Sequence, residues 1–524
     1  MKIIKYSVGL LLLLLTACNK NYLNVSPQSQ LSSTTFWRDS SDATLALVGV
    51  YSTWAAAHPY QIYFSDDWSD DAIPTGFWHG YYYYTWGVGN ISATNADLDT
   101  YWAALYSVIR SANVFLANVD RCAMSATLKE QLKGEIRFIR AYEYHLLYYT
   151  WGEVPLTTEP LNVGSLKVPR AQTGGTFSLI LQDLDSAVAS LPVAAPQAGR
   201  ITKGAALAFK SRVLLYEGMF AAAAAVSDSL INMNVYALLR TPAGDGYHQI
   251  VNTKQGNNQE EILAWQNDGI IRSNDQASFC NFFTNTLVSP TNALVSSYEG
   301  YDKATDQTVP VDTSTTTSRF LNRDPRLDFT VAHTGSLING QLLNSEALPL
   351  SNQSTGYGCA KYITDDILAN SPHLTTDNML IRYAEVLLTY AEAKIEANQI
   401  DQSVLDAIND VRSRAYGTVL SDIAHYPEVT ATDQPTLRAV VRNERRVELA
   451  FEGFRWFDIK RWEIAAGQGG TMNGPVIGAY LSNGTYLNAG TRALSDPNRD
   501  YLRPIPQAEI DLEGSAVLAQ NPGY

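Results

Sequence analysis

Apolar residues recur with the spacing of one helix face through much of this chain. The stretch 378–398 places them at every third or fourth position around Leu387, with Asp377 in position to cap the helix that this spacing predicts. A second helix is predicted over 401–415, with Asp401 at its start. Because only a short break separates the two helices, we expect them to pack antiparallel as a helical hairpin.

The same pattern occurs twice earlier in the chain. A helix over 202–217 is followed by Gly218, a residue type that often ends helices, and by the alanine-rich stretch 220–233. Further upstream, a helix over 98–119 is followed by one over 127–151. Hairpins of similar size, with alanines where helices approach closely, predict an all-α fold of tetratricopeptide-like helix pairs. An irregular helical bundle is the alternative, because the repeat is imperfect.

Stretches without a helical period separate these hairpins. Residues 243–259 and 302–318 are rich in Gly, Asn, Thr and Asp, which predicts loops. Residues 468–500 have a similar composition, but their Gly-Pro and Asn-Gly pairs indicate turns between short extended pieces. A short strand is predicted at 261–266. Long loops in a compact protein are often functional, so we expect a ligand to bind among them.

The first eighteen residues have the order of parts found in a bacterial lipoprotein signal. Two lysines precede an apolar run at 8–15 that is too short to span a bilayer, and small residues then lead to Cys18. Residues 1–17 are therefore predicted to be removed as a signal peptide, and Cys18 is predicted to carry the lipid that anchors the mature chain. The alternative is an ordinary secretory signal in which Cys18 has no special role.

Charge and cysteine content exclude several classes of function. The chain has 38 Lys and Arg residues against 52 Asp and Glu residues, and the net charge of -14 disfavours nucleic acid and anionic lipid head groups as partners. After Cys18, only Cys122, Cys280 and Cys359 remain, and no Cys or His spacing typical of zinc occurs. Phosphate-loop, dinucleotide-binding and nucleophile-elbow motifs are also missing. We therefore predict no catalytic residues, no metal and no cofactor.

The most unusual composition lies at 60–90, YQIYFSDDWSDDAIPTGFWHGYYYYTWGVGN. We call these residues the aromatic segment. Its proline and glycines predict a loop and no helix. Flat rings stack on the apolar face of a sugar and carboxylates accept hydrogen bonds from its hydroxyls, so the segment predicts a sugar-binding surface. The alternative is that most of the rings anchor a long loop in the core. We expect stacking on Trp78, Tyr81, Tyr83 and Trp86, with Asp66 and Asp70 accepting hydroxyl hydrogen bonds.

Several stretches resemble one known family, the SusD/RagB family of surface lipoproteins from glycan-uptake systems. The resemblance is carried, in family order, by GEIRFIRAYEYHLLYYTWGEVPL at 134–156, TKGAALAFKSRVLLYEG at 202–218, IRYAEVLLTYAEA at 381–393, RNERRVELAFEGFRWFDIKRW at 442–462, and YLRPIPQAEIDL at 501–512 with the final QNPGY. These stretches are distributed along the chain, so the resemblance extends over nearly the whole mature chain.

The resemblance implies a single domain over 18–524. Its expected parts are an N-terminal helical half at 18–235, a loop-rich portion at 236–375 and a C-terminal helical half at 376–524. The family's architecture is a right-handed superhelix of tetratricopeptide-like helix pairs, packed against an irregular portion with a few short strands that carries the ligand site.

The resemblance also implies a function. Members of the family are anchored by lipid to the outer face of a Gram-negative outer membrane. There they bind oligosaccharide or polysaccharide without cleaving it and cap a SusC-like TonB-dependent transporter. From the family's placement of its ligand region, Trp265, Tyr298 and Tyr301 are weaker candidates for sugar contact. The glycan itself is not implied, because ligands vary widely among relatives.

A basic stretch near the C-terminal end allows two interpretations. Arginines at 438, 442, 445 and 446 alternate with glutamates at 444, 448 and 452. They could bind an anionic ligand, but charges at helical spacing commonly tie neighbouring helices together, and we interpret them as structural.

Two other functions stay open. Asp66, Asp67, Asp70 and Asp71 could supply the carboxylate pair of a glycoside hydrolase, although such clusters more often cap turns or hold calcium, which we do not predict. A helical-repeat lipoprotein that serves as a scaffold for outer-membrane assembly would bind a protein or peptide in its superhelical groove. Its function would not depend on the aromatic segment.

Overall fold

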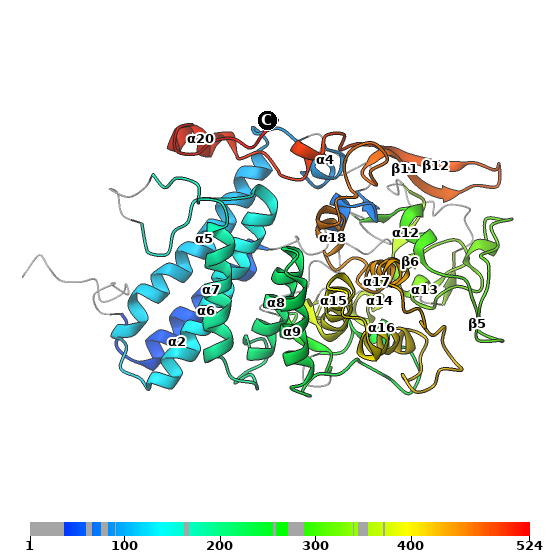
Figure 1. Ribbon diagram of the computed structural model, residues 1–524, viewed down its shortest axis with the longest axis horizontal. Helices are drawn as coiled ribbons and strands as arrows, with labels where there is room; N and C mark the ends of the chain where they lie inside the picture. Colours follow the sequence, from blue (N-terminus) through cyan, green and yellow to red (C-terminus); the bar gives the residue numbers. More distant parts are fainter. Residues whose placement is uncertain are drawn as a thin grey trace, which may run out of the picture.

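Figure 1 shows the computed structural model of the chain. The structure describes residues 36–58, 65–74, 82–89, 91–161, 167–254, 258–270, 288–338, 340–343, 355–369 and 373–524, of which 65, 82–84 and 341 are described by backbone alone. The predicted signal segment with Cys18 lies outside these residues. Of the described cysteines, Cys122 and Cys359 are both buried and free.

A continuous row of helices forms one side of the molecule (Figure 1). Each helix packs on the next in the order α2 (Ser40–Ala57), α5 (Ala96–Asn118), α6 (Ala126–Trp151), α7 (Gly175–Ser190), α8 (Lys203–Tyr216) and α9 (Phe220–Ile231). The row continues from α9 to α15 (Tyr383–Glu396), on which α16 (Gln402–Ala415) and α17 (Gln434–Glu448) both pack. The predicted helical hairpins are confirmed, and with them the helical, tetratricopeptide-like fold class.

Local chemistry sets the helix ends as the sequence predicts at several points. The Thr202 side chain accepts a hydrogen bond from the Ala205 N–H at the start of α8, and Asp401 accepts one from the Ser403 N–H at the start of α16. Gly218 follows α8 with a φ of 69°, a left-handed conformation that glycine adopts without strain.

One predicted helix start is wrong. Asn378–Arg382 forms strand β10, which pairs antiparallel with β2 (Glu261–Trp265), and α15 begins only at Tyr383. Asp377 therefore caps no helix, and its carboxylate accepts a hydrogen bond of 2.9 Å from the Asn267 N–H. The predicted strand at 261–266 is confirmed, and its need for a partner explains why residues 378–382 are extended.

Short two-stranded antiparallel ribbons and short helices make up the other side of the molecule. The ribbons are β1 (Ala72–Ile73) with β3 (Ser289–Pro290), β4 (Tyr301–Asp302) with β5 (Gln307–Thr308), β6 (Val331–Ala332) with β9 (Gly358–Cys359), β7 (Leu337–Ile338) with β8 (Gln341–Leu342), and β11 (Asn473–Tyr480) with β12 (Tyr486–Ala493). Helix α20 (Gln507–Glu513) is not on this side and lies against α5 of the helical row (Figure 1). The helices of this side are α10 (Gly246–Gln249), α12 (Asn292–Ser297), α13 (Arg326–Thr330), α14 (Asp365–Leu368), α18 (Arg455–Arg461) and α19 (Pro497–Asp500), with a 3-10 turn η6 (Ser318–Phe320). We use the name loop-rich portion for this whole side, which adds β1, β11, β12, α18 and α19 to the predicted 236–375.

Two apolar cores correspond to the two sides. The larger core fills the helical row and contains Trp54 and Trp151, whereas a smaller core under the loop-rich portion contains Tyr298, Tyr357 and Phe451. No helix among the described residues has the length and apolar content needed to cross a bilayer.

The aromatic segment contains helix where a loop was expected. Its described parts are a 3-10 turn, η2 (Ser65–Trp68), strand β1, and α4 (Tyr82–Val88), so the prediction that glycine excludes a helix here is wrong. Gly87 explains the outcome: α4 packs on η2 so closely that a Cβ at Gly87 would overlap the Asp67 carbonyl oxygen. Glycine serves close packing at this position and does not end the helix.

This packing predicts opposite effects for two glycine substitutions. Gly87→Ala should lower the free energy of unfolding by about 1–3 kcal/mol, because the added methyl group has no room. Gly49→Ala is the matched control, since nothing lies within 4 Å of its would-be Cβ in α2. It should raise the free energy of unfolding by about 0.5–1 kcal/mol, because alanine favours a helix more than glycine does. Thermal and denaturant unfolding of the two variants measures both effects, and equal changes would contradict the packing described.

Candidate functional site

The aspartates of the aromatic segment face the protein interior. Asp70 accepts hydrogen bonds from Arg455 Nε at 2.7 Å and Nη2 at 2.8 Å, and Asp71 Oδ1 accepts one from Arg446 Nε at 2.7 Å. Asp66 Oδ2 accepts a hydrogen bond of 2.8 Å from the Gly453 N–H. The three aspartates and Arg455 are buried, and Arg446 is partly buried. The expectation that Asp66 and Asp70 accept hydrogen bonds from a ligand is therefore corrected: Asp70 binds an arginine, and Asp66 binds the backbone beside it.

The pKa values of two neighbouring carboxyl groups in this cluster are shifted in opposite directions. Burial raises the pKa of Asp67 well above its usual value, and the charge of Asp66 adds to the effect. Neither carboxyl oxygen of Asp67 has a hydrogen-bond partner among the described residues. Burial also opposes ionisation of Asp70, but the charges of Arg446 and Arg455 and the hydrogen bonds from Arg455 outweigh it and lower its pKa.

The described rings of the aromatic segment are also buried. Trp86 has no exposed surface, and its ring centroid lies 4.5 Å from that of Trp68 and 5.7 Å from that of Tyr101. The expectation that Trp86 offers an open stacking face is wrong, because the ring fills the junction between α4, η2 and α5. Trp78 and Tyr81 lie outside the described residues, and so does the side chain of Tyr83.

The three weaker candidates for sugar contact are buried as well. Trp265 is 5% exposed and stacks on His58, with ring centroids 5.7 Å apart. Tyr298 is 1% exposed, and Tyr301 is 4% exposed with its ring 4.5 Å from that of Tyr416. These rings are packed in the protein interior. The prediction that they contact a ligand is therefore wrong. Apolar burial accounts for all three positions.

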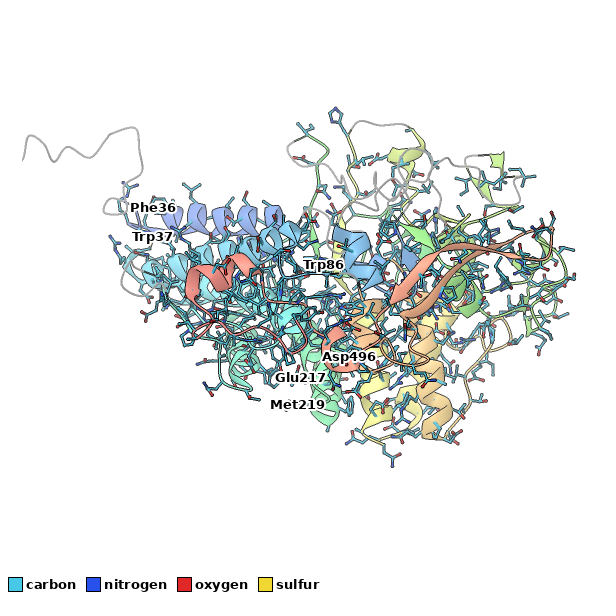
Figure 2. The ribbon with its side chains drawn as sticks, turned by 90° about the horizontal axis from the view of Figure 1, so that it is seen from above. Phe36, Trp37, Trp86, Glu217, Met219 and Asp496 are labelled. Carbon is cyan, nitrogen blue, oxygen red and sulfur yellow. The ribbon has the colours of Figure 1, made fainter. Side chains whose placement is uncertain are left out.

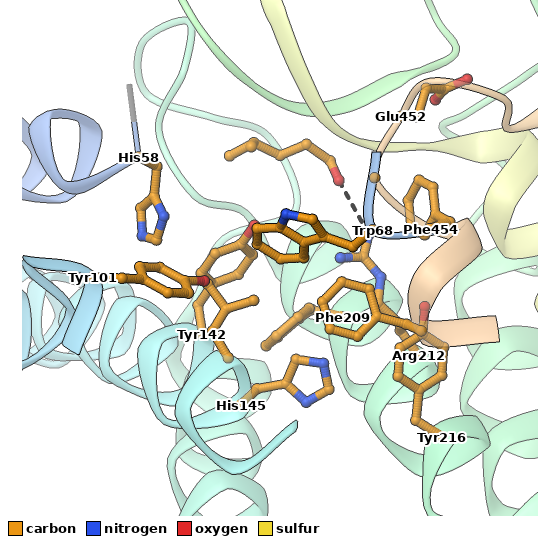
Figure 3. Close-up of a pocket in the computed structure, with 14 residues that line it drawn as sticks. His58, Trp68, Tyr101, Tyr142, His145, Phe209, Arg212, Tyr216, Glu452 and Phe454 are labelled. Carbon is orange, nitrogen blue, oxygen red and sulfur yellow. Dashed lines mark hydrogen bonds between the residues drawn. The ribbon is translucent and has the colours of Figure 1, made fainter. Parts of the chain in front are cut away.

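A pocket beside these rings is too small for a sugar. It has a volume of about 60 Å³ and lies between the helical row and residues 452–457. Figure 3 shows His58, Trp68 and Tyr101 around it, together with the guanidinium of Arg212, which donates a hydrogen bond of 3.1 Å to the Leu380 carbonyl oxygen. This volume accommodates a few water molecules, whereas pockets for organic ligands typically measure about 300–1,000 Å³.

The basic stretch near the C-terminal end is structural, as interpreted from the sequence. Arg438 and Arg442 bind Glu396 of α15, Arg445 binds Asp458 of α18, and Arg446 binds Asp71 of the aromatic segment. The partners lie on other elements and not on α17 itself. The arginines thus join α17 to the helical row on one side and to the aromatic segment on the other.

The sequence did not reveal that the glutamates of this stretch form the centre of a buried charge network. Glu448 of α17 accepts hydrogen bonds from Arg326 at 3.0 Å, from Arg382 at 2.7 Å and from Arg414. Glu444, one turn earlier on the same face, binds Arg326 and Arg412. The four-residue spacing of the two glutamates was the available signal, since it places them on one helix face.

A model of the SusD family matches residues 252–524, and a model described as "Starch-binding associating with outer membrane" matches residues 21–215. The chain belongs to the SusD family. Among curated relatives, SusD-like protein P38 of Formosa agariphila is 26% identical over 484 residues, which cover 88% of this chain and 91% of the relative. A SusD-like protein of Bacteroides ovatus is 24% identical, covering 86% of this chain and 80% of the relative.

Solved structures agree with the family. A SusD-like protein from Bacteroides fragilis superposes with a TM-score of 0.77 at 25% identity, over 95% of this chain and all of that one. A second B. fragilis structure, titled a SusD-like carbohydrate binding protein, gives a TM-score of 0.76 at 26% identity, covering 91% and 99%. A protein titled "Laminarin binding SusD-like protein" shares the fold, with a TM-score of 0.64 at 22% identity over 93% and 100%.

Because Asp67 and Asp70 have opposite environments, their substitution should change the free energy of unfolding with opposite dependences on pH. The raised pKa of Asp67 means that its ionised form destabilises the folded state, so the loss grows as the pH rises above the unfolded value near 4. Asp67→Asn should therefore raise the free energy of unfolding at pH 7 by about 1 kcal/mol or more and change it little at pH 4.

Asp70→Asn is the matched control. Its lowered pKa means that ionised Asp70 stabilises the folded state above pH 4 and that this contribution is lost as the pH falls. Asp70→Asn should lower the free energy of unfolding at pH 7 by about 3–5 kcal/mol, because Arg455 loses its buried partner, and by less at lower pH. Unfolding followed between about pH 2 and pH 7 tests both, because the Asp70 contribution is lost below pH 4. A pH dependence of the same sign in the two variants would contradict the electrostatic account.

Proposed function

We propose that this protein captures oligosaccharide or polysaccharide at the cell surface and delivers it to a SusC-like TonB-dependent transporter in the outer membrane. Membership of the SusD family supports the proposal, as do solved relatives whose titles state carbohydrate or laminarin binding. The description of the second family model, with its starch binding and its association with the outer membrane, agrees with it.

The observation that carries the sugar-binding part is the way the aromatic segment is held. Its residues at 65–74 are fixed by buried contacts with Arg446, Gly453 and Arg455, and its α4 packs on η2. Trp78 and Tyr81 belong to the stretch between these two fixed points. Flat aromatic rings such as these stack on the apolar face of a sugar, which supports a sugar site in this stretch.

The attachment to the membrane is part of the same proposal. Residues 1–17 serve as a signal peptide, Cys18 carries the lipid, and 18–524 form one SusD-like domain facing the exterior. An anchored receptor beside a transporter works by raising the local concentration of its ligand, so a single weak sugar site is sufficient.

Binding without cleavage fits the contacts of the four aspartates better than hydrolysis does. Glycoside hydrolysis needs two carboxyl groups that flank the scissile bond. Asp70 and Asp71 are buried and bound to arginines, and Asp66 and Asp67 have no exposed surface. Release of reducing ends from candidate glycans by the purified protein would contradict this part of the proposal.

Substituting the two proposed platforms together tests the site. In the unlipidated chain 19–524, Trp78→Ala with Tyr81→Ala should weaken glycan binding about thirtyfold, since each ring contributes about 1 kcal/mol. A glycan-array screen identifies the ligand, and calorimetric titration measures its dissociation constant. Tyr486→Ala is the control, because that ring is 44% exposed on β12 outside the aromatic segment, and it should leave the affinity unchanged. Equal affinities of the double variant and the unmodified chain, at unchanged thermal stability, would refute the assignment.

A further inference from the structure

A pocket lies between α5, residues 155–161 and α20, and we call it the α5–α20 pocket. Its volume of about 500 Å³ is typical of a site for an organic ligand. Helix α20 lies across the end of the helical row and contacts α5 (Figure 1, Figure 2). None of the described residues of the aromatic segment lines this pocket, so it is a separate candidate site.

Hydrogen bonds fix the walls of the α5–α20 pocket. The Tyr106 hydroxyl of α5 donates one of 2.8 Å to the Pro155 carbonyl oxygen. The Gln507 N–H, at the start of α20, donates one of 2.8 Å to the Ala93 carbonyl oxygen just before α5. The two walls are thus held in place on either side of α5. The pocket is therefore preformed, which lowers the entropic cost of binding a ligand.

Two aromatic residues of α5, Trp102 and Tyr106, line the pocket, and we call them the aromatic pair. Their ring centroids lie 5.1 Å apart. Trp102 is only 4% exposed, yet its indole N–H donates no hydrogen bond within the described part of the chain. An unpaired donor in so buried a side chain favours a ligand that brings an acceptor, such as a hydroxyl. The rings themselves favour an aromatic or apolar body beside them.

Acidic side chains gather at the α20 end of the pocket. Glu509 and Glu513 line it with Asp99 close by, and none of the three forms an ion pair with a described basic side chain. Asp99 Oδ1 and Glu513 Oε2 are buried and accept no hydrogen bond from the described residues. Burial raises the pKa of Glu509, and the charges of Asp99 and Glu513 add to this effect. A bound cation would relieve the repulsion among the three carboxylates.

The placement of the charged groups favours an organic cation over a metal ion. Among the described residues, no three carboxylate, histidine or cysteine side chains form a group that could hold a metal ion. Arg110 is the one basic residue among the described residues that line the pocket, and it is exposed. Along α5 the helix rises roughly 16 Å from Asp99 to Arg110, which exceeds the screening length of about 8 Å at physiological salt. The charge of Arg110 therefore does not oppose a cation at the α20 end.

We propose that the α5–α20 pocket binds an aromatic amine, with its ammonium group at Glu509 and Glu513 and its ring against the aromatic pair. The carboxylates accept charge-assisted hydrogen bonds from the ammonium group, and the aromatic pair packs on the body of the ligand. The net charge of -14 favours the approach of a cation. The ligand is not a glycan, so the proposal holds whether or not the aromatic segment binds one.

Calorimetric titration of the unlipidated chain 19–524 with two matched probes tests the proposal. Tyramine carries an ammonium group and a phenol hydroxyl, and tyrosol has the same body with a neutral hydroxyl in place of the ammonium group. Tyramine should bind about tenfold more tightly than tyrosol, because only tyramine pairs with the carboxylates. Equal affinity for the two probes would overturn the proposal, as would the absence of tyramine binding.

Charge removal on α20 locates the bound amine. Glu509→Gln with Glu513→Gln keeps the shape of both side chains and should weaken tyramine binding about tenfold or more, while leaving tyrosol binding unchanged. Asp511→Asn is the matched control, because Asp511 is exposed on the same helix and does not line the pocket. It should leave the affinity for tyramine unchanged. Tyramine binding that survives the double variant, or that falls equally in Asp511→Asn, would contradict the assignment.

Two alanines of α5 provide a steric test that leaves the acidic residues intact. Ala103 is exposed and lines the pocket, whereas Ala117 is exposed on the same helix and does not line it. Ala103→Trp should abolish tyramine binding, and Ala117→Trp should not change it. The variant Trp78→Ala with Tyr81→Ala should bind tyramine as the unmodified chain does. Loss of binding in that variant, with binding kept in Ala103→Trp, would place the amine on the aromatic segment and overturn the proposal.

Discussion

The buried carboxylate of Glu448 is the interaction on which the rest of the structure depends. It lies among three arginines that come from separate elements: Arg326 of α13, Arg382 at the end of β10 and Arg414 of α16. Burial opposes its ionisation, but the three positive charges outweigh this effect and hold its pKa far below the usual range. Because removing one member of such a network leaves an unpaired buried charge, at a cost of about 3–5 kcal/mol, the network locks the loop-rich portion to the helical row.

The same helix extends this lock to the aromatic segment. Arg446, two residues before Glu448, binds Asp71, and Arg455, at the start of α18, binds Asp70. The family stretch at 442–462 therefore fixes the base of the segment through these contacts. Buried charge holds this frame, and Trp78 and Tyr81, which we propose as the sugar platforms, belong to the stretch between its two fixed parts.

Sequence reasoning succeeded where local chemistry decides structure and failed where distant contacts decide it. Apolar spacing and caps such as Asp401 sufficed for the helix pairs, because both act within a few residues. Strand β10 was missed, because its apolar residues continue the spacing of α15 and its partner β2 lies more than 100 residues upstream. The exposure of Trp86 and of Asp70 was mispredicted, since composition does not reveal that a ring packs on Trp68 or that an arginine 385 residues away binds the carboxylate.

We propose that a base locked by arginines presents the aromatic segment to carbohydrate. A crystal structure of the chain with its glycan bound tests this most directly. The account predicts sugar rings stacked on residues 75–81, with the contacts from Arg446 to Asp71 and from Arg455 to Asp70 unchanged. A glycan bound away from the aromatic segment, or one that displaces those arginines to reach the aspartates, would contradict it.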